Sequence, residues 1–293
     1  MATCNVTKGN LGLSQCNKLP QMIVGMITTP ADFSIPAATY AVEADLLTYL
    51  NAALLDPAAD RIYLWPNFRT FENISTEAVY EDTPMAYLPV RDGDYRFKFG
   101  IKENLCLHKK MYTHRASNGR VILIDNENQL IGTELSDGSF AGLTMQMLHT
   151  EKFMFNDGSV STKSPIVIAL QNNKELDKDG SILQADFVGE LYRIVDVTLT
   201  IVGTPTTSSI VVDVAAECDG TAITGLVVAD FNLTDDDDGA NHAISSATES
   251  STVPGRYTLA GTAFEDSVLN LDAPDVLSIQ AYESTGGVAV TIP

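Results

Sequence analysis

Apolar and polar residues alternate along much of the chain, a pattern that predicts strands. The clearest case is YRFKFGIK at residues 95–102, where the apolar side chains fall on one face of a strand and Arg96, Lys98 and Lys102 on the other. RVILIDNENQLIGTEL at 120–135 gives two apolar runs around a polar turn, and LTMQMLHTEKFMF and SPIVIAL are further candidate strands.

Turn signals separate these runs. Asp-Gly and Asn-Gly pairs tolerate the positive φ of tight hairpin turns. Such pairs stand at 92–93, 118–119, 137–138, 157–158, 179–180, 219–220 and 238–239. We therefore expect the strands to be joined mostly by hairpins.

One segment has a helical period. TYAVEADLLTYLNAALLD, at 39–56, places Val42, Leu46, Leu47, Leu50 and Leu54 at helical spacing, and Pro57 ends the helix soon after. Segments 1–36 and 65–90 read as irregular, the second because of its prolines. Residues 1–192 are thus predicted to form an antiparallel β-sandwich or barrel with one helix.

The last hundred residues show only short strands. The predicted runs are about 193–203, 209–217, 226–233, 241–247, 255–264, 276–283 and 287–292. Regular turn signals between them favour a second β-sandwich. Its inward-facing residues are predicted to include Ile210, Val212 and Val214, and then Leu277, Ile279 and Ala281.

Charge divides the chain in the same place. The net charge is −20; residues 1–192 hold 16 basic and 23 acidic side chains (−7), whereas 193–293 hold 2 basic and 15 acidic ones (−13). We predict two domains, 1–192 and 193–293. The strong negative charge disfavours sequence-specific nucleic-acid recognition, because affinity for nucleic acid comes largely from Lys and Arg contacts with phosphate.

The sequence indicates a cytoplasmic place of synthesis and assembly. The N-terminus lacks the apolar run of a secretory signal, and no run approaches the roughly 20 residues of a membrane span. Cys4, Cys16, Cys106 and Cys218 are scattered, so reduced thiols are expected, with a Cys4–Cys16 disulfide as the alternative.

Two acidic stretches are candidate calcium sites. In TDDDDG (234–239), alignment with a helix-loop-helix calcium loop misses two of the four ligands, which favours a solvated loop. In ELDKDGSILQAD, Glu175, Asp177, Asp179 and Asp186 have suitable spacing, but the flanking segments are strand-like. We expect a polar hairpin turn there, and no metal site is assigned.

The stretch 96–120 offers two further candidates. Cys106, His108 and His114 fit no zinc spacing, so a strand with histidines at its edge is the expected reading. Seven basic residues, Arg96, Lys98, Lys102, Lys109, Lys110, Arg115 and Arg120, face one acid, Glu103. They indicate either one half of a complementary contact with an acidic surface of another copy, or a solvated hairpin.

Catalytic motifs are absent from the sequence: it has no GxSxG, HExxH, GxxxxGK[ST] or GxGxxG. We therefore predict no enzyme activity, no catalytic residues and no cofactor.

Two resemblances remain. DVAAECDGTAITGLVVADFNLTDDDDG followed by SSTVPGRYTLAGTAF resembles bacterial and phage immunoglobulin-like modules, in which a Gly-x-Tyr-x-Leu strand, here Gly255, Tyr257 and Leu259, follows a TGL-x-x-x-DF strand. The N-terminal region resembles major tail tube proteins of tailed phages in its irregular N-terminus, its single helix and the polar hairpins of RVILIDNENQLIGTELSDGSFAG.

The second resemblance implies a structural virion protein whose sheets join in hexameric rings, with the rings stacked into a conduit for DNA. Its partners would be copies of itself and other virion proteins, with non-specific passage of DNA and no membrane. It would be located in the virion, after assembly in the bacterial cytoplasm. The alternatives are another head or tail component, a carbohydrate-binding or adhesin protein, and a hydrolase with a sandwich accessory domain.

Overall fold

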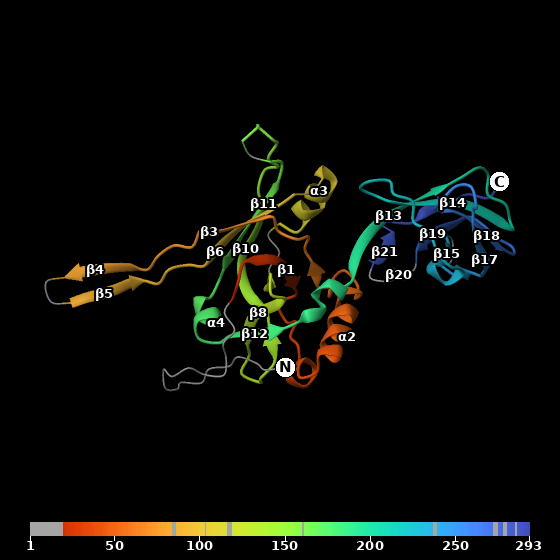
Figure 1. Ribbon diagram of the computed structural model, residues 1–293. Coiled ribbons are helices and arrows are strands. Elements are labelled where there is room, and N and C mark those ends of the chain that lie inside the picture. Colours follow the sequence, from red (N-terminus) through yellow and green to blue (C-terminus); the bar gives the residue numbers. More distant parts are fainter. Residues whose placement is uncertain are drawn as a thin grey trace. The chain divides into compact units, whose positions relative to one another are not determined.

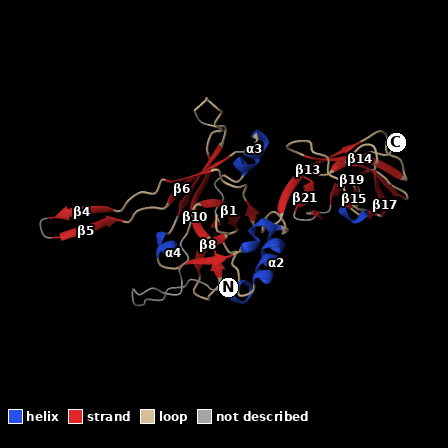
Figure 2. Ribbon diagram, in the orientation of Figure 1, coloured by secondary structure: helices blue, strands red, loops and turns tan. Residues whose placement is uncertain are grey.

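The computed structural model describes residues 20–293 except 84–85, 103, 116–118, 160, 237–238, 272–274, 278–279 and 285. The protein is mainly β, with its strands in several largely antiparallel sheets (Figures 1 and 2), which confirms the predicted fold class. The chain divides into two compact units, residues 1–191 (unit 1) and 192–293 (unit 2), one residue from the predicted boundary.

Unit 1 is built on a ten-stranded sheet that branches at β7. Its strands are β1 (Ile23–Thr29), β2 (Tyr63–Leu64), β3 (Thr70–Asn73), β6 (Arg96–Ile101), β7 (Arg120–Asp125), β8 (Gln129–Glu134), β9 (Phe140–Ala141), β10 (Leu143–Thr150), β11 (Ser164–Leu170) and β12 (Gly180–Gln184). β7 pairs with β1, and also with β8 at one end and β10 at the other. One branch runs through β8 to β12, and the other through β10, β11 and β6 to β3.

The main core of unit 1 gathers apolar side chains from both branches. Met26 of β1, Ile131 of β8 and Ile166 of β11 belong to one buried cluster. The predicted strand at 95–102 is β6, and its expected inner residues Phe97, Phe99 and Ile101 are 7%, 1% and 0% exposed. Here the alternation in the sequence predicted both the strand and its buried face.

Unit 1 contains four helices among its described residues, where one was predicted. α1 (Ala37–Tyr40) precedes α2 (Glu43–Leu54), which is the predicted helix and buries Leu46, Leu50 and Leu54. α3 (Leu105–Thr113) and α4 (Asn173–Asp177) lie where a strand and a hairpin turn were expected. A 3-10 turn, η1 (Asp186–Glu190), follows β12.

The two segments predicted to be irregular contain strands. Segment 1–36 includes β1, which is mostly buried and pairs with β7 and β2; residues 1–19 lie outside the described part. Segment 65–90 includes β3 and most of the pair β4 (Val79–Thr83) and β5 (Ala86–Arg91). Pro89 lies within β5, in a two-stranded sheet where every strand is an edge strand, the position that accepts proline.

Unit 2 has two sheets with one shared core. The six-stranded sheet has the order β17 (Ile244–Glu249), β18 (Arg256–Gly261), β14 (Ser209–Ala216), β13 (Arg193–Ile201), β21 (Gln280–Ser284) and β20 (Asp275–Leu277). The four-stranded sheet has the order β16 (Asn241–His242), β15 (Phe231–Asp235), β19 (Ser267–Leu271) and β22 (Val288–Val290). A 3-10 turn, η2 (Val228–Asp230), leads into β15.

Most of the predicted strands of unit 2 are present, and β19 is an additional one. Ile210, Val212 and Val214 of β14 are buried as expected, as is Ala281 of β21. The predicted inward position Ile279 lies outside the described residues, and the side chain of Leu277 is not among those described.

Glycines of the turn pairs act in two different ways. Gly138 has a φ of +82°, as a tight turn requires, and the carboxylate of Asp137 accepts hydrogen bonds from the backbone and hydroxyl of Ser139 at 2.9 and 2.6 Å. Position 93 requires glycine because there is no room for a side chain: an added Cβ would lie 2.2 Å from the carbonyl oxygen of Thr76. The Asp-Gly pair at 92–93 therefore marks a close backbone approach.

The expectation of reduced thiols is wrong for the two described cysteines, since Cys106 and Cys218 are each disulfide-bonded. The wide separation along the chain that suggested free thiols does not determine which side chains meet in space. Cys4 and Cys16 lie outside the described residues. No helix among the described residues is long and apolar enough to cross a membrane.

Candidate functional site

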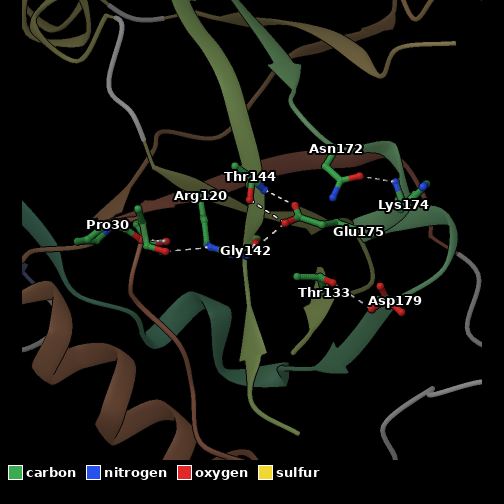
Figure 3. A network of polar contacts seen from close by, with 11 residues as sticks. Pro30, Arg120, Thr133, Gly142, Thr144, Asn172, Lys174, Glu175 and Asp179 are labelled. Atoms are coloured by element: carbon green, nitrogen blue, oxygen red, sulfur yellow. Dashed lines mark hydrogen bonds and ion pairs between the residues drawn. The ribbon is translucent and has the colours of Figure 1, made fainter. Parts of the chain in front are cut away.

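Glu175, the first carboxylate of the candidate calcium loop, is part of a network inside unit 1. It lies on α4, and its two oxygens accept hydrogen bonds from the backbone N–H and hydroxyl of Thr144 at 2.6 and 2.7 Å (Figure 3). Nη1 of Arg120 lies 3.7 Å from Oε1 of Glu175, and both side chains are less than one-fifth exposed. The carboxylate is thus engaged by β10 and β7.

Arg120 extends this network to neighbouring backbone. Its Nε donates to the carbonyl of Ala31 at 3.0 Å, and its Nη1 donates to that of Gly142 at 2.9 Å (Figure 3). One guanidinium therefore joins the segment after β1, the start of β10 and, through Glu175, α4. These contacts hold the three segments of unit 1 together.

The other three carboxylates of the candidate loop have separate partners. Asp177 accepts a hydrogen bond from the hydroxyl of Tyr95 at 2.5 Å, Asp179 lies 3.5 Å from Nζ of Lys178, and Asp186 accepts one from the side chain of Gln184 at 2.8 Å. Among the described residues no three His, Cys, Asp or Glu side chains come together in a way that could hold a metal ion.

The predicted hairpin turn in this stretch is instead a short helix followed by a strand. Asn172 caps α4, because its side chain accepts a hydrogen bond from the N–H of Lys174 at 3.1 Å (Figure 3). β11 before it and β12 after it are the strands that the flanking sequence predicted.

The segment with Cys106, His108 and His114 is the helix α3, which corrects the prediction of a strand. Asn104 begins it, since its side chain accepts a hydrogen bond from the N–H of Leu107 at 2.8 Å. His108 is buried with Nδ1 3.0 Å from the hydroxyl of Ser164, and burial lowers its pKa. His114 ends the helix and packs against the ring of Tyr63, at a centroid distance of 4.6 Å.

The basic run 96–120 is divided by the fold. Several members have partners within unit 1: Arg96 with Asp94 at 3.2 Å, Lys98 with Glu151 at 2.7 Å, Arg115 with the ring of His149 at 2.7 Å, and Arg120 with Glu175. Lys102 and Lys109, near and on α3, are exposed. Only part of the run is therefore available for a contact with another molecule.

The acidic stretch of unit 2 ends a strand. Asp235, in β15, lies 3.3 Å from Nε2 of His242 in the neighbouring β16. The N–H of Asp236 donates to the carbonyl of Asp266 at 3.2 Å. Asp237 and Asp238 lie outside the described residues, so the prediction of a solvated loop remains a prediction for them.

The sequence did not predict a projecting arm, which we define as residues 74–94 with the strands β4 and β5. In Figure 1 the two strands extend beyond the ends of β3 and β6. They pair only with each other in the described part of the chain. Val79 and Tyr80 in this arm are 50% and 48% exposed.

The base of the arm, which we call the neck (residues 74–76 and 93–95), is held by hydrogen bonds between its two segments and to β6. The N–H of Thr76 donates to the carbonyl of Asp94, and the N–H of Asp94 donates to the hydroxyl of Thr76, both at 3.0 Å. Next to them, the N–H of Arg96 donates to the hydroxyl of Ser75 at 3.0 Å. The arm thus leaves the sheet through a neck whose two segments are hydrogen-bonded to each other.

α4 supports this neck from one side. The side chain of Asn173 donates to the carbonyl of Gly93, and the carboxylate of Asp177 accepts from Tyr95. That hydrogen bond is the main cause that raises the pKa of Tyr95 to about 12, with burial second. A cleft of about 370 Å³ lies between α4 and the neck. These contacts are suited to holding the arm in place.

Comparison of the chain with protein-family models, with curated proteins and with solved structures finds no match.

Proposed function

We propose that this chain is a structural subunit of a virion that assembles with copies of itself, and that it forms the rings of a tail tube. The observation that carries the proposal is the arm. A two-stranded hairpin is marginally stable at best in water unless something packs against it. In the described residues of unit 1, no third strand joins β4 and β5.

The strand edges of the arm support the same proposal. β4 and β5 each have one edge with no strand beside it among the described residues, and such edges readily pair with another chain. Val79 and Tyr80 add exposed apolar surface, which is favourable to bury. The partner that we propose for these edges is a second copy of the chain, which is always present together with the first.

The overall charge agrees with a conduit for DNA. At a net charge of −20 the chain repels phosphate, and a lumen that repels phosphate does not retain DNA in transit.

A sugar-binding role is not favoured by unit 2. Sugar sites usually present an exposed aromatic platform, whereas the large apolar side chains exposed in the described part of unit 2 are Val227, Val228 and Val253. No observation therefore raises the carbohydrate-binding alternative above the structural one.

Sedimentation velocity and negative-stain electron microscopy of the purified chain over a range of concentrations test the proposal. We expect concentration-dependent growth from monomers to rings or tubes. Replacing residues 77–92 by a short Gly-Ser turn should leave the circular dichroism spectrum characteristic of a folded β protein and abolish this growth. A wild-type chain that stays monomeric under all assembly conditions would contradict the proposal.

A further inference from the structure

Two different surfaces lie at opposite ends of the same strands in unit 1. The arm ends at Asp94, two residues before Arg96, the first residue of β6, while residues 102–115, which include α3, follow Ile101, the last one. Ser164 pairs with Ile101, so the connection 151–163 between β10 and β11 also lies at the α3 end. Figure 1 shows the arm and α3 on opposite sides of β6 and β11.

The two ends carry opposite charge. Residues 74–94 of the arm contain five acidic side chains and one basic one, whereas residues 102–115 contain four basic and one acidic. Glu77 and Asp92 of the arm are exposed, as are Lys109 of α3 and Lys152 of the connection. The chain has a net charge of −20, so the charge at the basic end is opposite in sign to that of the chain as a whole.

Both ends also expose apolar side chains. At the α3 end, Phe155 is 74% exposed and Leu105 is 49% exposed. Phe155 packs edge-on against Phe153, with ring centroids 5.2 Å apart, and Phe153 packs edge-on against His108 of α3 at 5.3 Å. The connection is thus fixed to α3 by aromatic contacts and presents a formed surface.

We propose that the acidic arm of one copy docks on the basic end of a second copy, formed by residues 102–115 and 151–163. Opposite charges fix the orientation of the contact, and burial of the exposed apolar side chains at both ends stabilises it. Because the two surfaces are different and lie at opposite ends of one sheet, the contact is head-to-tail and each copy can engage two neighbours. The inference rests on the proposed self-assembly and identifies the surfaces involved.

Charge reversal in the full-length chain tests this pairing. We expect Glu77→Lys/Asp92→Lys and Lys109→Glu/Lys152→Glu each to weaken association about tenfold or more, measured by sedimentation velocity. Mixing the two variants should restore association, because the reversed arm of one then faces the reversed basic end of the other. Added salt should weaken wild-type association.

Lys178→Glu/Arg193→Glu is the matched control. It makes the same change in net charge as Lys109→Glu/Lys152→Glu, at two exposed positions outside both surfaces, and it should assemble like wild type. Phe155→Ser should weaken association without changing its dependence on salt.

The outcomes separate this inference from the proposed function. If the wild type assembles but Lys109→Glu/Lys152→Glu does so equally well, or if mixing fails to restore association, the arm docks elsewhere and the inference is wrong while self-assembly stands. A wild type that remains monomeric rejects both. Restored assembly on mixing, with an unaffected control, supports both.

Discussion

The hydroxyl of Tyr257 satisfies two backbone groups in the interior of unit 2. It donates to the carbonyl of Ile223 at 2.9 Å and accepts from the N–H of Leu226 at 3.2 Å, and the side chain is fully buried. Burial is the main cause that raises its pKa. Just before it, Gly255 has a φ of +72°, and an added Cβ there would lie 2.7 Å from the carbonyl oxygen of Val214.

We expect Tyr257→Phe to lower the free energy of unfolding of unit 2 by about 1–3 kcal/mol, because it leaves the backbone groups of Ile223 and Leu226 buried without their partner. Urea unfolding followed by circular dichroism measures the change. Thr258→Val removes a hydroxyl from an exposed position on the same strand and should stay within about 0.5 kcal/mol of wild type. Equal losses in the two variants would contradict the role given to the Tyr257 hydroxyl.

His108 should make the stability of unit 1 depend on pH. Burial lowers its pKa in the folded state, so the unfolded chain binds the proton first, near a pH of about 6.5. The contribution of neutral His108 is complete above that pH and is lost as the pH falls from there to the folded-state pKa.

We therefore expect the free energy of unfolding of wild type to fall more steeply between pH 7 and acid pH than that of His108→Gln, as measured by urea unfolding at several pH values. His114, His149 and His242 are present in both proteins, so the difference between the two curves isolates position 108. Parallel curves would show that His108 does not couple to folding.

At the level of elements, the neck of the arm depends on the absence of a side chain at Gly93. We expect Gly93→Ala to disrupt the hydrogen bonds between Thr76 and Asp94, because its Cβ would lie 2.2 Å from a backbone oxygen. Hydrogen exchange of the amides in 74–94 should speed up, and unit 1 should lose on the order of 1–3 kcal/mol.

Gly189→Ala is the control for this change. A Cβ at Gly189 meets nothing within 4 Å and its φ is not positive, so exchange in the arm should match wild type. Wild-type exchange in Gly93→Ala as well would mean that the neck adjusts to the added methyl group.

The sequence predicted some of the elements that bury apolar side chains and missed others, such as β1 and β19. β6 was evident because Phe97 and Phe99 alternate with basic residues. The strands of the arm were missed because they pair with no other strand in the described chain, and Pro84 and Pro89 suggested irregular structure. α3 was missed because a nine-residue helix has too few turns for a clear period, although its cap Asn104 was a visible signal.

The candidate sites show the same limit. The spacing of Glu175, Asp177, Asp179 and Asp186 suggested oxygen ligands that converge on one ion. Instead, Glu175 and Asp177 bind Thr144 and Tyr95, which are far away in the sequence, and Asp186 binds its near neighbour Gln184. Spacing fixes which residues are near along the chain, whereas tertiary structure decides which way each carboxylate is directed. The basic run was recognised, yet its division into paired and exposed members required the fold.

At the scale of the whole molecule, each unit has a core of its own. In the described strands, no pairing joins a strand of unit 1 to one of unit 2, and the core of unit 2 uses residues from 197 onward. The composition difference between 1–192 and 193–293 thus coincides, within one residue, with a division in the structure.

We expect residues 192–293 expressed alone, with Cys218→Ser because the fragment holds no second cysteine, to fold and to unfold cooperatively in urea, as followed by circular dichroism and by dispersion of amide NMR signals. A fragment that begins at residue 204 lacks β13, which lies between β14 and β21 inside the six-stranded sheet, and it should not fold. A disordered 192–293 fragment would show that unit 2 needs unit 1.

The parallel pairing of β13 and β21 has a mechanical consequence. Arg193 to Val197 pair in register with Gln280 to Ser284, and the two strands run in the same direction. Tension that enters the unit before Arg193 and leaves it after Ser284 pulls these strands lengthwise in opposite directions. The hydrogen bonds of the pair are then loaded in shear and must break together instead of one after another from an end. Unit 2 should therefore resist stretching along the chain.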